Sequence, residues 1–182
     1  MALRIMLPVD ILVDEHKLIM RAVDLIKIET GQITTSESVN ANKISAFMDF
    51  FRIYADRFHH GKEEGILFRR LKEKKLKQVD SEMMKELMLE HAFARRTVTA
   101  LEKANEGYIA GKKTALREVL ELLSTLVKLY PVHIEKEDKH FFYPCMEYFS
   151  PQEQKTMLND FTSFNQSFTD KRYEAIIDSF TK

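Results

Sequence analysis

The sequence predicts an all-α protein, an up-down antiparallel four-helix bundle with short extra helices at its C-terminus. Gly (5) and Pro (4) are scarce among the 182 residues, while good helix formers are plentiful. Apolar residues recur every three or four positions along four long segments, which is the period of an amphipathic helix. We expect residues 1–149 to form the bundle and residues 150–182 to form a helical extension packed on it.

The first two helices follow from this period and from their flanking residues. The first is expected to start near Pro8 and to end near Glu29, because Gly31 suits the position just after a helix. The polar residues 30–40 then read as a loop. The second helix is expected over about 38–75.

The next two helices have less regular ends. The third is expected over about 81–109, with Asp80 or Ser81 as its cap. The fourth is expected over about 113–148. Pro131 lies inside its apolar pattern, so this helix should kink or restart there.

The last part of the chain predicts one or two short amphipathic helices. Ser150, Pro151 and Glu153 have the order of a helix start, with a capping hydroxyl, a proline at the first position and an acid at the third. The apolar side of this tail is expected to cover the bundle of its own chain. A homodimer formed through this region is the other expected use.

Composition limits the partners of the chain. Lys+Arg 28 balances Asp+Glu 28, so no nucleic-acid partner is expected. The single Cys145 excludes an internal disulfide and a cysteine-rich metal site. No apolar run is long enough to span a bilayer, and residues 1–12 lack the pattern of a signal peptide. We therefore expect a cytoplasmic protein without a membrane partner.

Six polar residues fall on the apolar stripes of the four predicted helices, where carboxylates are rare. Two pairs have the spacing His-x-x-x-Glu, which places both side chains on one helix face, one turn apart. The six residues are His16, His59, Glu63, His91, His133 and Glu137.

This set predicts a metal site rather than a hydrogen-bonded polar core. A buried carboxylate without a partner costs several kcal/mol or becomes protonated, and a cation removes that cost. Imidazole and carboxylate ligands suit iron, manganese or zinc. Two carboxylates shared by four imidazoles favour two ions bridged by Glu63 and Glu137. Two imidazoles for each ion leave open coordination positions for a small ligand such as O2 or NO.

The sequence around these residues resembles the hemerythrin family, in its HHE cation-binding branch, over about residues 10–148. The motifs are His16, the segment 58–68 (FHHGKEEGILF), the pair Glu90-His91 and the segment 133–138 (HIEKED). The resemblance implies a four-helix bundle that holds two non-haem iron ions. These ions would be bridged by an oxo or hydroxo group and by two carboxylates.

The resemblance also implies which residues bind which ion. His16 and His59 would bind one iron, and His91 and His133 the other, while two glutamates form the bridges. The family pattern places the first glutamate four residues before the Leu of Ile-Leu-Phe, which selects Glu63. For the second bridge, Glu137 fits the HHE branch.

Some positions stay open at this stage. Asp138 would be the second bridge if the chain followed the oxygen-carrying branch, which has an Asp five residues after the His. That branch also has a further histidine where this chain has Arg95. His60 and His140 could supply the missing imidazole. We include His60 among the candidate metal ligands. His140 lies seven residues after His133 and three after Glu137, so we expect it to face the same interior. We favour a packed histidine over a ligand at that position, and a hydrogen bond to a carboxylate of the site is the next choice.

Three functions fit these expectations. The first is a di-iron protein that binds O2 or NO for sensing, storage or scavenging. The second is an enzyme that reduces peroxide or NO, or that repairs iron–sulfur clusters. The third is an interaction module that the metal only stabilises. The sequence does not decide whether the chain is an enzyme.

Overall fold

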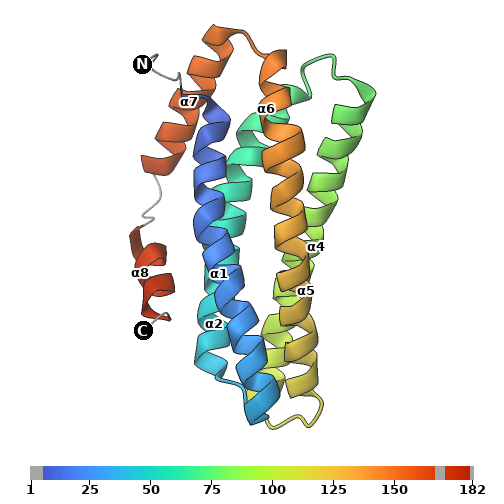
Figure 1. Ribbon diagram of the computed structural model, residues 1–182, viewed down its shortest axis with the longest axis vertical. Helices are drawn as coiled ribbons and strands as arrows, with labels where there is room; N and C mark the ends of the chain where they lie inside the picture. Colours follow the sequence, from blue (N-terminus) through green and yellow to red (C-terminus); the bar gives the residue numbers. More distant parts are fainter. Residues whose placement is uncertain (1–5, 167–170, 181–182) are drawn as a thin grey trace.

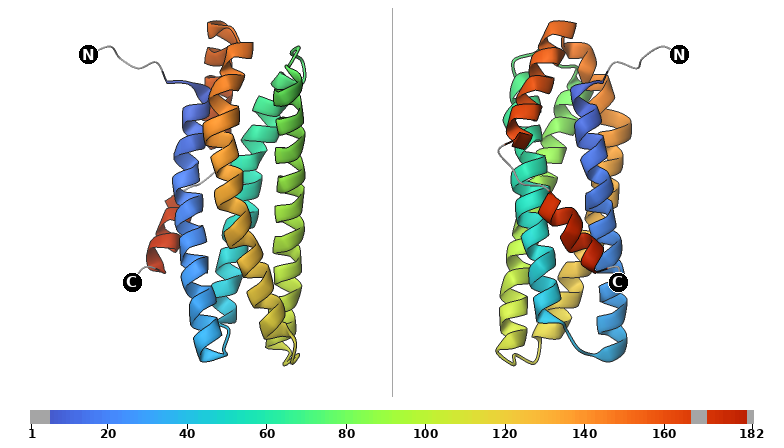
Figure 2. Two further views of the ribbon diagram at one scale, coloured as in Figure 1. Left: turned by 45° about the vertical axis from the view of Figure 1, so that its right-hand side comes forward. Right: turned by 90° about the vertical axis from the view of Figure 1, so that its left-hand side faces the viewer.

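The computed structural model describes residues 6–166 and 171–180, and it shows an all-helical protein (Figures 1 and 2). Four long helices lie antiparallel, so the predicted fold class is confirmed. The first is α1 (Pro8–Ser36) and the third is α4 (Gln78–Ile109). The second joins α2 (Ala41–Asp49), the π-helical segments η1 (Phe50–His60) and η2 (Glu63–Phe68), and α3 (Arg69–Leu71). The fourth joins α5 (Ala115–Lys136), the π-helical segment η3 (Glu137–Phe141), α6 (Phe142–Cys145) and the 3₁₀ turn η4 (Met146–Tyr148).

The helix α1 is longer than its sequence predicts, because it continues past Gly31. It ends at Ser36, and the next residue, Glu37, adopts a left-handed conformation (φ 49°). Thr30 and Thr34 turn their hydroxyls back to backbone carbonyls four residues earlier, so these polar side chains are accommodated within the helix. Ile33 is buried and ties the additional turn to the core. The predicted loop therefore shrinks to residues 37–40.

The predictions for the starts of the later helices also need correction. The helix α4 begins at Gln78, earlier than predicted, and no side chain caps it. The carboxylate of Asp80 lies within the first turn and accepts a hydrogen bond from the Tyr148 hydroxyl. The helix α5 continues through Pro131 without a restart. Its regular α-helical geometry ends later, at the π-helical segment η3.

The π-helical segments coincide with the predicted ligand positions. Adjacent residues of a regular α-helix do not share a face, yet His59 and His60 in η1 are both buried. Glu63 begins η2 and Glu137 begins η3. Wider π-type turns are rare and occur often at functional sites. The irregular turns here bring one more imidazole into the interior than the α-helical period predicts.

The core consists of two apolar clusters, one toward each end of the bundle. Phe58, Ala94 and Tyr130 belong to the cluster nearer the α1–α2 link. Leu12 and Phe141 belong to the cluster at the opposite end. The buried histidines and glutamates lie between these clusters, so apolar side chains screen them from water along the bundle axis.

The C-terminal helices α7 (Pro151–Gln166) and α8 (Lys171–Ser179) lie against the bundle (Figure 2, right). Both contact α1, and α7 also contacts η2. The helix start predicted at Ser150 is confirmed: the backbone N–H of Ser150 donates to Glu153 at 2.8 Å, and that of Glu153 donates to the Ser150 hydroxyl at 3.3 Å. Among the described residues, no helix is both long and apolar enough to cross a membrane.

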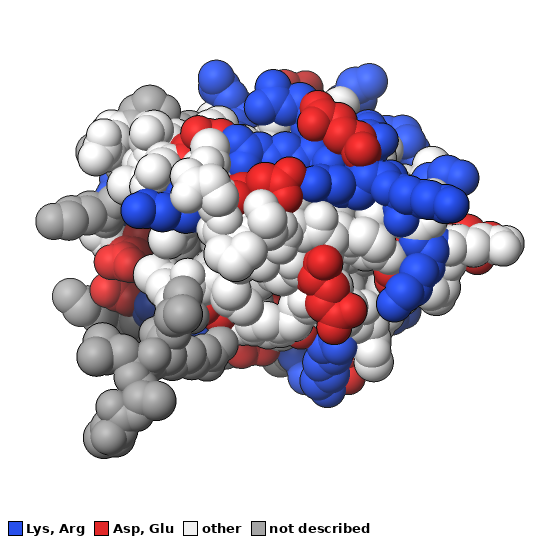
Figure 3. Space-filling view, turned by 90° about the horizontal axis from the view of Figure 1, so that it is seen from above, with Lys and Arg blue, Asp and Glu red and all other residues white. Residues whose placement is uncertain are grey.

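The link between α3 and α4 lies at the end of the bundle that Figure 3 views from above. Lysine and arginine side chains gather on one side of this end. Lys72, Lys75 and Lys77 of the link are exposed. They agree with the solvated surface expected for a run of charged residues, and the chain as a whole carries no net charge.

Candidate metal centre

The structure brings all seven candidate ligands together inside the bundle. Each side chain is buried, with at most 4% of its surface exposed. Their donor atoms form two groups, in each of which the donor atoms lie within 4.8 Å of one another. The first group contains His60, His91 and His133, and the second contains His16, His59, Glu63 and Glu137.

The first group consists of three imidazoles from three helices. Nε2 of His91 on α4 lies 3.2 Å from Nε2 of His133 on α5. The ring of His60 on η1 stacks on the ring of His91, with 3.8 Å between centroids and 12° between planes. Stacking of this kind places His60 within the group, at a position that its sequence spacing left open.

The second group joins two imidazoles to two carboxylates. Nε2 of His59 lies 3.1 Å from Oε1 of Glu63, which is one turn later on the same helix. Nε2 of His16 lies 3.3 Å from Oε2 of Glu137. All four side chains are buried, so few water molecules can compete for these atoms.

The two glutamates also reach the first group. Oε2 of Glu63 lies 3.4 Å from Nε2 of His91. Glu137 places Oε1 3.6 Å from His91 and Oε2 3.3 Å from His133. Both carboxylates therefore span from one imidazole group to the other, which is the placement that a bridge between two ions requires.

A ring of four further carboxylates orients the imidazoles from outside. Glu15 on α1 accepts a hydrogen bond of 2.9 Å from Nδ1 of His59, on the second helix. Glu64 on the second helix accepts a hydrogen bond of 2.7 Å from Nδ1 of His91, on α4. Each carboxylate thus holds a histidine of the next helix in the chain.

The same arrangement continues around the bundle and closes. Glu90 on α4 accepts a hydrogen bond of 2.9 Å from Nδ1 of His133, on α5. Asp138 on η3 accepts a hydrogen bond of 2.8 Å from Nδ1 of His16, back on α1. With these four Nδ1–H groups donated outward, the Nε2 atoms of the same four histidines face the interior, where a metal ion would bind them.

The ring has a simple origin in the sequence. Successive residues of a helix point about 100° apart, so the neighbour of an inward-facing residue faces an adjacent helix. Each of the four carboxylates is such a neighbour. The adjacent pairs are Glu15-His16, Glu63-Glu64, Glu90-His91 and Glu137-Asp138. Sequence reasoning missed this role, although acidic residues next to inward-facing positions could have indicated it.

Three of these four carboxylates also contact a cation. Arg95 donates to Glu64 at 2.8 Å and occupies the position where the oxygen-carrying branch has a histidine. Lys62 is fully buried and donates to Glu15 and to Asn165, and its ammonium lies 3.3 Å from the centroid of the Phe58 ring. The third pair is Lys136 with Glu90. Burial opposes the charge of Glu64, but His91 and Arg95 outweigh it and lower the pKa of that carboxyl. His133 and Lys136 lower the pKa of Glu90 against its burial in the same way.

Without a metal ion, the site holds protons instead. Burial opposes a charge on His16, but Asp138 and Glu137 outweigh burial and raise its pKa to about 10. His91 has a pKa raised to about 10, because Glu137 and Glu64 outweigh its burial. Burial and the neighbouring His91 hold the pKa of His60 well below its usual value.

Several buried side-chain atoms lack a hydrogen-bond partner within the described part of the chain. Buried polar atoms in proteins nearly always have partners, since an unpaired one costs free energy. The unpaired set includes Nε2 of His16, Nε2 of His59, Nδ1 of His60 and all four carboxylate oxygens of Glu63 and Glu137. These are nitrogen and oxygen donors with free lone pairs, so the residues fit a pair of cations.

The structure also shows where the residues lie whose roles the sequence left open. Glu137 is fully buried and faces the histidines, whereas Asp138 turns outward to hold His16. His140 is exposed, so the expectation that it faces the interior was wrong. The π-helical segment η3 changes the direction in which the residues after Glu137 point. A regular α-helical period does not predict this change.

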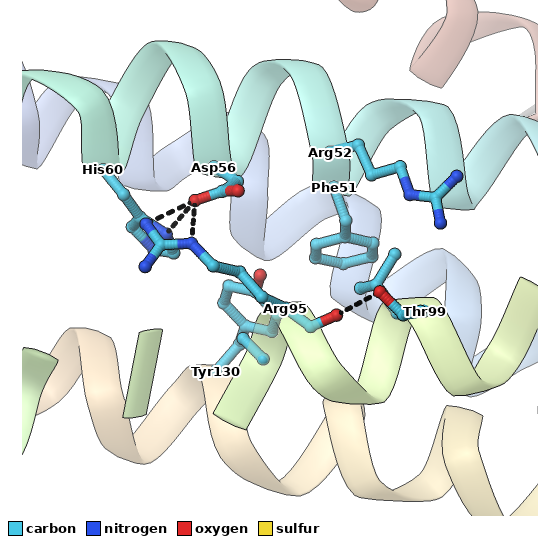
Figure 4. Close-up of a pocket in the computed structure, with 9 residues that line it drawn as sticks. Phe51, Arg52, Asp56, His60, Arg95, Thr99 and Tyr130 are labelled. Atoms are coloured by element: carbon cyan, nitrogen blue, oxygen red, sulfur yellow. Dashed lines mark hydrogen bonds and ion pairs between the residues drawn. The ribbon is translucent and has the colours of Figure 1, made fainter. Parts of the chain in front are cut away.

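A pocket of about 230 Å³ adjoins the first imidazole group (Figure 4). It lies between the second helix, α4 and α5. Its floor is apolar, and polar side chains line one side. The lining residues are Phe51, Arg52, Asp56, His60, Ala94, Arg95, Val98, Thr99 and Tyr130.

Comparison with protein families matches residues 7–145 to the Hemerythrin HHE cation binding domain. No curated protein and no solved structure matches the chain significantly. The family match covers more than half of the chain and contains all seven buried candidate ligands. The chain therefore belongs to the hemerythrin family and carries its HHE cation-binding domain.

Proposed function

We propose that this protein binds two non-haem iron ions that are bridged by an oxo or hydroxo group and by two carboxylates. One ion would be held by His16 and His59, and the other by His60, His91 and His133, with Glu63 and Glu137 as the bridges. The observation that carries the proposal is the set of buried nitrogen and oxygen atoms that face one another without hydrogen-bond partners.

Two ions fit this site better than one. The donors fall into two groups, and each glutamate lies within 3.6 Å of a histidine from each group. A single ion could not satisfy both groups, and the remaining carboxylate oxygens would stay unpaired. Iron is preferred among the metals that suit imidazole and carboxylate ligands because of the family to which the chain belongs.

We further propose that the loaded centre binds O2 or NO as a sensor, store or scavenger. The ion held by His16 and His59 has two imidazoles, one fewer than its neighbour, which leaves a coordination position open. Bound iron supplies a redox-active ion that takes such small ligands at an open position. The protein contributes anchored imidazoles and an interior closed to bulk water.

Metal counting tests this proposal directly. Protein loaded anaerobically with iron(II) should retain about two iron ions per chain after desalting, as a bridged centre in a helix bundle requires. It should develop an oxo-to-iron absorption band in air and a different band with NO. His91→Ala should lose iron, whereas the exposed His140→Ala should retain it. Wild-type protein that retains no iron would refute the proposal.

Reduction of peroxide or NO is a second candidate, and the pocket in Figure 4 favours it. A carrier needs only a small open position, whereas a pocket of about 230 Å³ beside His60 can admit and release a reactant. Steady consumption of peroxide or NO with an added reductant would support this candidate. Binding without turnover would leave the carrier or sensor as the function.

A further inference from the structure

The side chain of Lys62 is fully buried, although it ends in an ammonium group. Lysine is rarely buried completely unless that group has partners. Here the ammonium donates hydrogen bonds to Glu15 on α1 and, at 2.8 Å, to the side-chain oxygen of Asn165 on α7. It also lies 3.3 Å from the centroid of the Phe58 ring, on its own helix. The groups around Lys62 therefore come from three parts of the chain, and one of them is the C-terminal helix α7.

Glu15 connects this ammonium to a candidate metal ligand. Its Oε1 accepts a hydrogen bond from Lys62, and its Oε2 accepts the hydrogen bond of 2.9 Å from Nδ1 of His59. A carboxylate held at both oxygens has a fixed plane, and it fixes the imidazole that donates to it. A continuous chain of hydrogen bonds thus runs from Asn165 on α7 to His59 inside the bundle.

The cations beside the other carboxylates of the ring are placed differently. Arg95 and Lys136 lie on α4 and α5, and their side chains are 39% and 21% exposed, against 0% for Lys62. Water can replace a lost partner of an exposed cation, but a buried ammonium that loses a partner bears the cost of its desolvation. The position of the Lys62 ammonium therefore depends on the side chain that α7 supplies.

The helix α7 lies along the bundle (Figure 2, right) and approaches the second helix closely beside Lys62. A methyl group on Gly61, the preceding residue, would lie 3.2 Å from the Phe164 ring of α7, so the glycine permits this approach. The Lys62 ammonium lies 5.9 Å from the centroid of the same ring. Met157 and Phe161 of α7 are fully buried and hold the helix in place. The contact from Asn165 is thus part of a packed interface.

We propose that Asn165 and Lys62 are positioning residues for the ion that His16 and His59 would hold, and that they act through Glu15. The inference rests on the proposed di-iron function and deepens it, because it gives the C-terminal helix a part in the ion that has the open coordination position. Coupling between two binding events is reciprocal. Docking of α7 therefore strengthens iron binding, and bound iron strengthens the docking of α7.

Iron affinity tests the first half of this coupling. Asn165→Leu removes the acceptor for Lys62 but keeps a side chain of similar size, so that water does not take its place. Its apparent affinity for iron(II), measured anaerobically against a competing chelator, should fall about fivefold, at the lower end of typical couplings. The matched control is Asn159→Leu, at an exposed position of the same helix, which should bind iron as the wild type does.

A conservative variant separates the hydrogen bond from the packing of α7. Asn165→Asp retains an oxygen that accepts from Lys62, so it should keep the affinity of the wild type. Equal affinities for Asn165→Leu and Asn159→Leu would overturn the proposal. A loss in Asn165→Asp as large as in Asn165→Leu would overturn it too, because the acceptor would then not be the cause.

Hydrogen exchange tests the second half of the coupling. In wild-type protein, loading with iron(II) should slow the exchange of the α7 amides about fivefold, because a reciprocal coupling has one magnitude. The same loading should leave the α7 amides of Asn165→Leu unchanged, which a merely structural contact would not predict. Wild-type protein that binds two iron ions without any change in α7 would overturn this proposal and leave the proposed function intact. Wild-type protein that retains no iron would instead refute the proposed function itself.

Discussion

Removing the charge of Glu90 should weaken metal binding, although the Glu90 side chain does not itself face the metal. The carboxylate accepts a hydrogen bond from Nδ1 of His133 at 2.9 Å and also contacts Lys136. In Glu90→Gln the charge disappears, so the imidazole is oriented less firmly and becomes a weaker donor to the metal. Loss of such an outer partner typically costs about 10–100-fold in metal affinity, or roughly 1.4–2.8 kcal/mol.

Glu86 provides a matched control for this substitution. It contacts the same Lys136, but no contact joins it to His133, and its side chain is 56% exposed. Glu86→Gln therefore removes a surface ion pair worth up to about 1 kcal/mol in stability and should leave metal affinity within about threefold, or roughly 0.7 kcal/mol. Apparent affinities would be measured anaerobically by titrating iron(II) against a competing chelator. Equal losses in both variants, or none in Glu90→Gln, would refute the idea that the ring orients the ligands.

Three further predictions concern stability. Removing the metal should lower the melting temperature by about 5–10 °C, if iron is held at a free concentration near 100 times its dissociation constant; an unchanged melting curve after chelation would contradict this. The metal-free protein should lose stability as pH rises from 6.5 toward about 10, because the folded pKa values of His16 and His91 are raised to about 10. The stability that their protonation contributes is complete below the ordinary pKa of 6.5 and is lost progressively as pH rises to the folded pKa. Thermal melts of apoprotein between pH 6 and 10 measure this, and a constant melting temperature would contradict it. Gly65→Ala should stabilise the second helix by up to about 1 kcal/mol, since nothing lies within 4 Å of an added methyl group. Gly61→Ala should gain less stability, because its methyl group would lie 3.2 Å from Phe164. Chemical denaturation compares the free energies of unfolding of the two variants, and a larger gain for Gly61→Ala would contradict this prediction.

The two glutamates that we propose as bridges show how much the local sequence pattern predicts. His59 and Glu63 share a helix face because they are four residues apart, and this follows from the helical period alone. The choice between Glu137 and Asp138 is different, because each would be reasonable on an isolated helix. Packing decides it: Glu137 is fully buried, whereas Asp138 is the partner that Nδ1 of His16 requires.

The histidines outside the six-residue pattern show where the helical period fails. His60 was an open choice because it is adjacent to His59 and should face elsewhere in an α-helix. His140 was expected inside because it lies three and seven residues after inward-facing positions. Both outcomes depend on π-helical segments, in which the face presented by each residue is shifted. Such segments form where tertiary contacts outweigh regular hydrogen bonding. The sequence of one helix alone therefore does not predict them.

By itself, the amino-acid order determined that this chain is helical, that four helices pair antiparallel, and that imidazoles and carboxylates lie on their apolar stripes. These properties are local, since they depend on residue type and on a period of about 3.6 residues. Only the tertiary structure decided that carboxylates of one helix hold histidines of the next, that His60 joins the first group, and that a pocket opens beside it. Those features arise from distances between helices, which are set by the packing of the whole core and not by the spacing along any one segment.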